Sequence, residues 1–215
     1  GQFSSLVFPL DFTGPGMYLF KIDYLFIPSI NMESTVTDIP QRGACLQLMD
    51  EHGMLPNIKA HSMTVCSFAL SLARAANQCG YSFDLAAIEA AALLHDITKT
   101  RSLTTNEDHA RTGADLLRRL GFCPIAGLVE GHVTPTDHDG PEITAQELIS
   151  YADKRVLHDQ VVSLEERFGY LYERYGRSEQ AIERISHARL RTVMIEEKLR
   201  NLFGQSPSSP TWNFF

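Results

Sequence analysis

The sequence contains little cysteine and little basic charge, and both shortages narrow the classes of protein to consider. Its 215 residues include four cysteines, and no two of them form a CxxC pair. This usage excludes a disulfide scaffold and a zinc finger, and it is typical of a reducing cytosol. Lysine and arginine total 19 against 26 acidic residues, a formal net charge of -7. We therefore expect a cytoplasmic protein without an extended nucleic-acid surface, because such surfaces are normally basic.

The sequence also lacks a clean hydrophobic run near its start. The apolar stretch at residues 17–30 is interrupted by Lys21, Asp23 and Pro28. A membrane-spanning helix needs about 20 consecutive apolar residues, and a signal peptide needs a basic segment ahead of its apolar core. We expect no membrane association. Residues 1–37 are predicted to be an extension, a strand or an arm, and Met32 is the predicted natural start because it precedes the first convincing helix.

The remaining chain has the length of one main domain and the pattern of helices. Typical domains contain about 100–200 residues, so a second domain is not expected. Pro40 fits the first turn of a helix, Asp84 fits a helix cap, and Thr144 with Glu147 forms a capping box. Residues 100–107 are polar and are predicted to form a turn. Apolar periodicity predicts helices over residues 40–51, 58–77, 85–95, 107–120, 124–132, 145–156, 163–175 and 178–203.

Histidines and aspartates interrupt the apolar faces of these helices. An unpaired polar group in a core costs about 2–7 kcal/mol, and an unpaired carboxylate costs far more. Several such groups therefore indicate one shared partner, and a metal centre is the simplest partner. The six residues of metal-ligand type that lie on or beside the apolar stripes are His61, His95, Asp96, His109, His132 and Asp153.

These residues resemble the signature of a known superfamily. His61, the doublet His95-Asp96 and the later Asp153 resemble the H…HD…D pattern of HD-domain metal-dependent phosphohydrolases over about residues 57–158. Thr98 stands where many members of the superfamily have glycine, which leaves the ligands intact. His109 and His132 resemble the six-ligand branch that binds two metals, to which the bacterial HD-type diadenosine tetraphosphate hydrolases are similar.

The resemblance implies an all-α HD-domain helical bundle over residues 38–160, followed by C-terminal helices at 161–204 and a tail at 205–215. It also implies a binuclear site, in which Asp96 bridges two divalent transition-metal ions. Imidazole with carboxylate ligation suits iron, manganese, cobalt, nickel or zinc, and does not choose among them. Two such ions activate water for hydrolysis of a phosphoester or phosphoanhydride bond without a protein nucleophile.

Cations near the predicted site complete the functional prediction. Asp96 and Lys99 are the predicted catalytic residues, and Lys99 matches the lysine that follows the doublet in the family. Lys99, Lys154 and Arg155 are the predicted substrate contacts, because each is near a ligand in sequence. The expected partner is a small phosphorylated molecule, in particular a nucleotide, and the chain could also form a homodimer. The charged segments around Arg167 and Arg184 are predicted to be solvated faces.

Two other functions remain open at this stage. Some HD-domain proteins use a similar six-ligand set as a di-iron oxygenase, which activates dioxygen. The third hypothesis is a non-catalytic regulatory module that retains the fold and a structural metal. Both alternatives predict bound metal without metal-stimulated phosphate release, so measurements of metal content and turnover separate them from the hydrolase.

Overall fold

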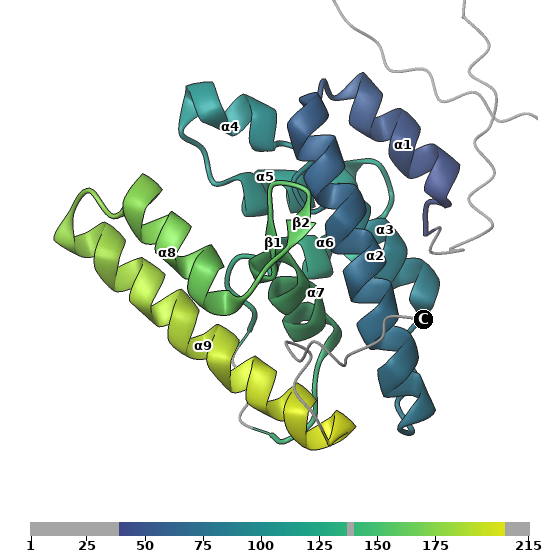
Figure 1. Ribbon diagram of the computed structural model, residues 1–215. Helices are drawn as coiled ribbons and strands as arrows, with labels where there is room; N and C mark the ends of the chain where they lie inside the picture. The colour runs from purple at the N-terminus through teal and green to yellow at the C-terminus, as the bar shows by residue number, and fades with distance from the viewer. Residues whose placement is uncertain (1–38, 137–139, 205–215) are drawn as a thin grey trace, which may run out of the picture. The chain divides into compact units, whose positions relative to one another are not determined.

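A computed structural model of the chain describes residues 39–136 and 140–204, which form an all-α fold with two short strands (Figure 1). The predicted N-terminal extension, the tail and Met32 lie outside the described residues. Over the described ranges, no helix combines the length and the apolar character needed to cross a bilayer. The elements in chain order are α1 (Arg42–Glu51), α2 (Pro56–Gln78), α3 (Leu85–Leu94), α4 (Lys99–Thr105), α5 (His109–Arg119), α6 (Cys123–Glu130), α7 (Ala145–Lys154), β1 (Val156–Leu157), β2 (Gln160–Val161), α8 (Leu164–Tyr175) and α9 (Glu179–Phe203).

Helix α3 lies in the core because it is apolar apart from Glu89, which forms an ion pair with Arg42 of α1. Its alanines let α1, α2, α6 and α7 approach closely. As predicted, Asp84 caps it, and its carboxylate accepts hydrogen bonds from the Ala86 and Ala87 amides. The helix ends at Leu94, and the two residues that follow it, His95 and Asp96, are buried inside the protein.

Helix ends elsewhere follow the predicted capping chemistry. Four helices are followed by a glycine that has a positive φ, a backbone conformation that costs glycine little. These glycines are Gly53, Gly80, Gly121 and Gly204. The predicted capping box at the start of α7 is present, with both hydrogen bonds between the side chains and backbone of Thr144 and Glu147. These local signals fix several of the helix ends, among them the start of the helix that carries Asp153.

Helices α8 and α9 run side by side, and α9 also contacts α7 (Figure 1). Phe168 of α8 and Leu199 of α9 are buried in the common core. Lys198 of α9 forms an ion pair with Glu147 of α7 at 2.7 Å. The α8–α9 hairpin is thereby attached to the helix that carries Asp153.

Four local predictions were wrong. Pro40 lies outside a helix, because α1 begins at Arg42 after its cap at Gln41. Residues 100–105 belong to α4 instead of a turn, and Asn106 ends this helix in a left-handed conformation with φ 57°. The helix predicted at 85–95 ends at Leu94, and His95 to Thr98 form a turn. The helix predicted to reach residue 156 ends at Lys154, because Val156 enters a two-residue hairpin whose turn contains His158 at φ 55°.

Candidate metal centre

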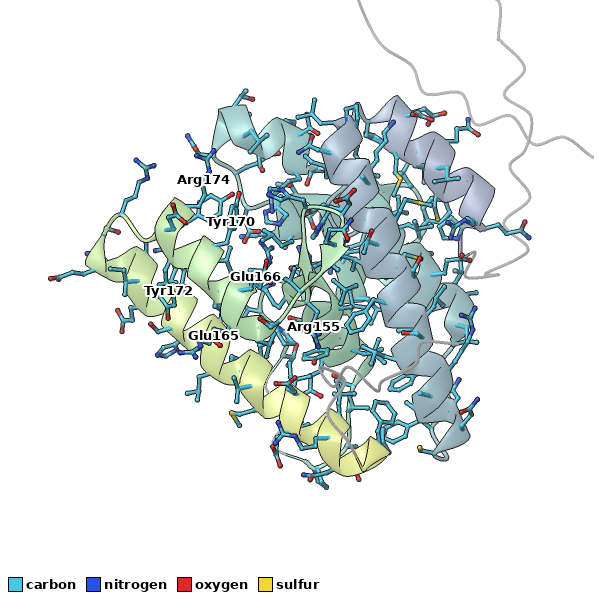
Figure 2. The ribbon with its side chains drawn as sticks, viewed as in Figure 1. Arg155, Glu165, Glu166, Tyr170, Tyr172 and Arg174 are labelled. Carbon is cyan, nitrogen blue, oxygen red and sulfur yellow. The ribbon has the colours of Figure 1, made fainter. Side chains whose placement is uncertain are left out.

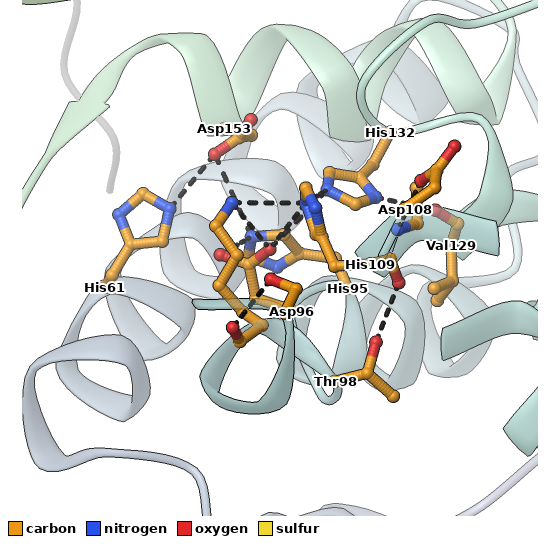
Figure 3. Close-up of polar contacts among 12 residues, drawn as sticks. His61, His95, Asp96, Thr98, Asp108, His109, Val129, His132 and Asp153 are labelled. Atoms are coloured by element: carbon orange, nitrogen blue, oxygen red, sulfur yellow. Dashed lines mark hydrogen bonds and ion pairs between the residues drawn. The ribbon is translucent and has the colours of Figure 1, made fainter. Parts of the chain in front are cut away.

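The six predicted ligand side chains converge at one place in the fold (Figure 3). His61 comes from α2 and Asp153 from α7, whereas His95 and Asp96 come from the turn after α3. His109 is the first residue of α5, and its helix is capped by Asp108. His132 follows the end of α6. Sequence segments that are far apart therefore supply the six side chains.

Asp153 joins His61 and His95 into a first group. The His61 Nε2 atom lies 3.0 Å from Asp153 Oδ1, and the His95 Nε2 atom lies 3.8 Å from the same oxygen. His95 is fully buried, and the other two side chains are nearly so. One ion can contact all three ligand atoms, because these atoms lie within 4.8 Å of one another.

Asp96 joins the remaining histidines into a second group. Its Oδ1 atom lies 3.1 Å from His109 Nε2 and 3.6 Å from His132 Nε2, and its Oδ2 atom lies 3.6 Å from His95 Nε2. The ligand atoms of His95, Asp96 and His132 also fall within 4.8 Å of one another. His95 therefore belongs to both groups of atoms that could hold an ion.

Hydrogen bonds to backbone carbonyls orient three of the imidazole rings. The Nδ1 atoms of His61, His95 and His132 donate to the carbonyls of His158, Ala92 and Val129 at 2.9, 2.7 and 2.6 Å. This assignment places the proton on Nδ1 and leaves the Nε2 lone pair facing the cluster. Metal-binding histidines commonly have such a hydrogen bond on the ring nitrogen that does not face the metal.

One atom of the cluster lacks the kind of partner that a metal ion would supply. Within the described residues, His95 Nε2 is buried and has no hydrogen-bond partner. A buried acceptor left unsatisfied costs about 1–3 kcal/mol. A metal ion at the cluster satisfies this lone pair, and the donor set of imidazole nitrogens and carboxylate oxygens suits a transition metal. The residues present therefore fit the predicted metal.

The electrostatic environment keeps both carboxylates ionised and lowers the pKa values of His95 and His109. Burial opposes ionisation of Asp96 and Asp153, but the neighbouring histidines and lysines outweigh it and hold both pKa values well below the usual range. Burial lowers the pKa of His95 to about 4 and also lowers the pKa of His109. Neutral imidazole and ionised carboxylate are the forms that bind metal.

The predicted cations take up three different positions. Lys99 Nζ lies 3.1 Å from His109 Nε2 and 3.5 Å from Asp96 Oδ1, inside the second group. Lys154 Nζ donates to Asp153 Oδ2 at 2.6 Å, at the edge of the first group. Arg155 lies elsewhere: it is buried, stacks near Phe68, and donates to the Tyr151 hydroxyl and the Val162 carbonyl. We therefore correct its predicted role from substrate contact to core packing.

Two adjoining cavities open onto the cluster. One has a volume of about 260 Å³ and the other about 490 Å³. His61, Asp96 and Lys99 line both of them, as does Arg167 of α8. Arg184 of α9 lines the smaller cavity with Lys154. The α8–α9 hairpin therefore forms a wall facing the candidate metal centre.

The prediction of a solvated face at Arg167 was wrong. Its backbone position lies three residues after Leu164 and four before Leu171, on the inward face of α8. That spacing was visible in the sequence, but the alternating charges around it favoured an exposed surface. Arg184 precedes Ile185, which also lines the smaller cavity. Both arginines are functional candidates that sequence reasoning missed.

Comparisons with known proteins find related sequences in archaea. The chain is 26% identical over 161 residues to an uncharacterised protein of Methanocaldococcus jannaschii, a match that covers 68% of this chain and 89% of the relative. It is 29% identical to a protein of Thermoplasma volcanium named tRNA (cytidine(56)-2'-O)-methyltransferase, over 81% of this chain and 55% of that protein. A protein of the same name from Picrophilus torridus is 26% identical, over 82% of this chain and 51% of the relative.

The chain therefore spans about half the length of the two methyltransferases it matches. No solved structure matches it. A family model described as HD domain matches residues 58–167, which include the doublet and all six converging side chains. The chain belongs to the HD domain family.

Proposed function

We propose that this protein is a metal-dependent phosphohydrolase that cleaves a phosphoester or phosphoanhydride bond of a nucleotide at a binuclear metal site. The observation that carries the proposal is the buried, unpartnered Nε2 atom of His95 at the point where both groups of ligand atoms meet. His61 and Asp153 complete the first proposed ion site with His95. Asp96, His109 and His132 supply the second, and the proposed bridge is Asp96.

Each side chain has a proposed task that follows from its surroundings. Metal ions in such a site lower the pKa of a water molecule and stabilise charge on a phosphoryl oxygen. Asp96 stays ionised because the neighbouring cationic and imidazole groups hold its pKa low. Lys99 lies within reach of both Asp96 and His109, so we assign it to the phosphoryl oxygens that gain charge. Lys154 fixes Asp153 through its hydrogen bond.

The charge of the cavities favours an anionic substrate. The protein as a whole is acidic, yet Lys99, Lys154, Arg167 and Arg184 all line the smaller cavity. Cations gathered beside a metal centre attract phosphate and are not needed for dioxygen. This observation is why we prefer the hydrolase to the di-iron oxygenase.

Metal content and turnover of the purified protein test the proposal. We expect about two transition-metal ions per chain under metal-replete conditions, and phosphate release from a nucleotide panel that is stimulated by divalent metal. Asp96→Asn is expected to lower turnover at least about 100-fold. Asp115→Asn is the matched control, because this aspartate is half exposed and, in the part of the chain that the structure describes, pairs with Arg118 away from the cluster. Fewer than two ions, or equal turnover in the two variants, contradicts the proposal.

The alternatives predict different results in the same preparation. A di-iron oxygenase consumes oxygen with its substrate and releases no phosphate. A regulatory module shows no turnover with the metal fully loaded. We do not assign methyl transfer to this chain, because the name of the two relatives belongs to whole proteins of which the match covers about half.

A further inference from the structure

Arg167 occupies a position that the proposed chemistry at the metal does not explain. It comes from α8, outside the elements that carry the six ligand side chains, and it lines both cavities. Among the residues that the structure describes, its buried Nε atom has no hydrogen-bond partner. A buried guanidinium N–H without an acceptor is costly, so an acceptor from outside the protein is expected there.

The other cations of the smaller cavity already have partners. Lys154 donates to Asp153, and Lys99 contacts Asp96 and His109. Within residues 39–136 and 140–204, neither Arg167 nor Arg184 has a carboxylate partner. The unneutralised charge of the cavity is therefore concentrated on the α8–α9 wall, opposite the candidate ligands. An anion held there is a different group from the one at the metal.

The larger cavity has an apolar and aromatic side that a phosphate does not need. Tyr170 and Leu171 of α8, Leu157 of β1 and Leu103 of α4 line it together with Arg174. Tyr170 lies edge-on to the His158 ring at 5.6 Å between centroids. Figure 2 shows Tyr170 and Arg174 on α8. An aromatic ring beside cations suits a nucleobase followed by phosphates.

Resting on the proposed function, we propose that Arg167 binds a phosphate group of the substrate that is not cleaved. The substrate class is then a nucleoside with at least two linked phosphates. One phosphoryl group lies at the metal centre, and the next accepts hydrogen bonds from the guanidinium of Arg167. Arg184 extends this anion subsite into the smaller cavity. A guanidinium suits this task because its fork of N–H groups matches two phosphate oxygens.

Direct binding tests the inference without turnover. The probes are AMP and the non-hydrolysable α,β-methylene analogue of ADP. The analogue has a second phosphorus group, which a methylene group joins to the first. We expect the metal-containing wild-type protein to bind the analogue at least tenfold more tightly than AMP in calorimetric titrations. Arg167→Gln is expected to remove most of this ratio, because the variant lacks the charged N–H donors that hold the second phosphate. Arg167→Lys is expected to retain part of it.

Two further variants keep the test decisive. Arg184→Gln changes an exposed side chain that lines the same cavity, and we expect a smaller loss of the ratio. Arg189→Gln, also exposed on α9 and absent from the cavity lining, is the matched control and should retain the full ratio.

A wild-type ratio near one, no measurable binding of either probe, or equal ratios in Arg167→Gln and Arg189→Gln overturns the inference. Turnover is measured separately on the same proteins. Phosphate release with an unchanged ratio in Arg167→Gln refutes the arginine subsite alone. A retained, Arg167-dependent ratio without any phosphate release refutes the hydrolase alone.

Discussion

The Nζ atom of Lys99 lies 3.1 Å from the Nε2 atom of His109, and the same ammonium group lies 3.5 Å from Asp96 Oδ1. A neutral imidazole has one acceptor nitrogen, so His109 Nε2 either accepts a hydrogen bond from Lys99 or ligates a metal ion. Lys99 and the second proposed ion therefore compete for the same atom. In the first group the nearby ammonium group, that of Lys154, contacts Asp153 Oδ2, whereas His61 and His95 approach Asp153 Oδ1.

Removing the ammonium group of Lys99 is expected to raise the affinity of the second site for its ion. In Lys99→Met we predict roughly tenfold higher affinity for that ion, which corresponds to about 1.4 kcal/mol. The affinity for the first ion should stay within about threefold, because Lys99 contacts neither His61 nor Asp153. Calorimetric titration of manganese into metal-stripped protein measures both. Lys59→Met is the control, since Lys59 pairs with Asp50 outside the site. Identical second-site affinities in the two variants contradict the competition.

Removing the metal is expected to lower the melting temperature. Without an ion, His95 Nε2 stays unsatisfied and the buried Asp96 and Asp153 depend on side-chain cations alone. A ligand present at 1,000 times its Kd stabilises the folded state by about 4 kcal/mol. For a chain of this size, each kcal/mol moves Tm by about 2–4 °C, so we predict a fall of at least about 8 °C. Chelator titration followed by differential scanning calorimetry measures it.

A variant that cannot hold the first ion controls for nonspecific effects of the chelator. Asp153→Asn lacks the carboxylate that joins His61 to His95, so the chelator should change its Tm by less than half as much as in the wild type. Complete removal of metal from the wild type without a fall in Tm rules out the buried cluster as a metal centre.

The metal-free protein is expected to lose stability in mild acid. Burial lowers the pKa of His95 to about 4, whereas an imidazole in an unfolded chain titrates near about 6.5. Because the folded pKa is lowered, this contribution is fully present above pH about 6.5 and is lost as the pH falls toward 4. We predict a loss of roughly 2 kcal/mol between pH 7.5 and pH 5. Burial lowers the pKa of His109 as well, so His109 acts in the same direction.

Urea denaturation at a series of pH values measures this loss. In His95→Asn most of the pH dependence between 7.5 and 5 should disappear, whereas His52→Asn, which changes an exposed histidine, should retain it. Asp96 and Asp153 add a further loss at lower pH, since their folded pKa values lie below the usual range and protonation releases their contribution. A flat wild-type profile from pH 7.5 to 5 refutes a buried, neutral His95.

The sequence predicted the helices and the cluster for the same physical reason. Apolar residues with helical spacing define an inward face, so a histidine on that face must lie in the interior. His61 and Asp153 were identified in this way, and the structure brings them within 3.0 Å. Their role as metal ligands stays a prediction that the titrations above test.

Other features depend on tertiary packing that local patterns do not contain. Lys154 and Arg155 are adjacent near the end of α7, and successive helical residues point about 100° apart, so one faces the site and the other the core. The α4 helix is short and largely exposed, and its polar sequence is equally typical of a turn. Arg167 faces the cavities only because α8 packs against α7.

Gly131 provides a test of how His132 is positioned. A Cβ atom at residue 131 would lie 2.6 Å from the side-chain amide carbon of Gln146. That amide donates to the Gly127 carbonyl at 2.8 Å and accepts from the Thr136 amide at 3.1 Å. Gly131→Ala must displace the amide at the end of the flexible Gln146 side chain, so we predict a loss of about 0.5–1.5 kcal/mol in the free energy of unfolding through these hydrogen bonds.

Gly127 provides a control substitution for which we expect the opposite change in stability. Gly127 lies inside α6, and a Cβ atom there meets nothing within 4 Å. Gly127→Ala should therefore stabilise the protein by roughly 0.5–1 kcal/mol, because alanine favours the helix more than glycine does. Since His132 follows Gly131 directly, Gly131→Ala should also weaken metal binding at the second site, whereas Gly127→Ala should not. Equal stability of the two variants in urea denaturation contradicts the contact between Gln146 and the segment that positions His132.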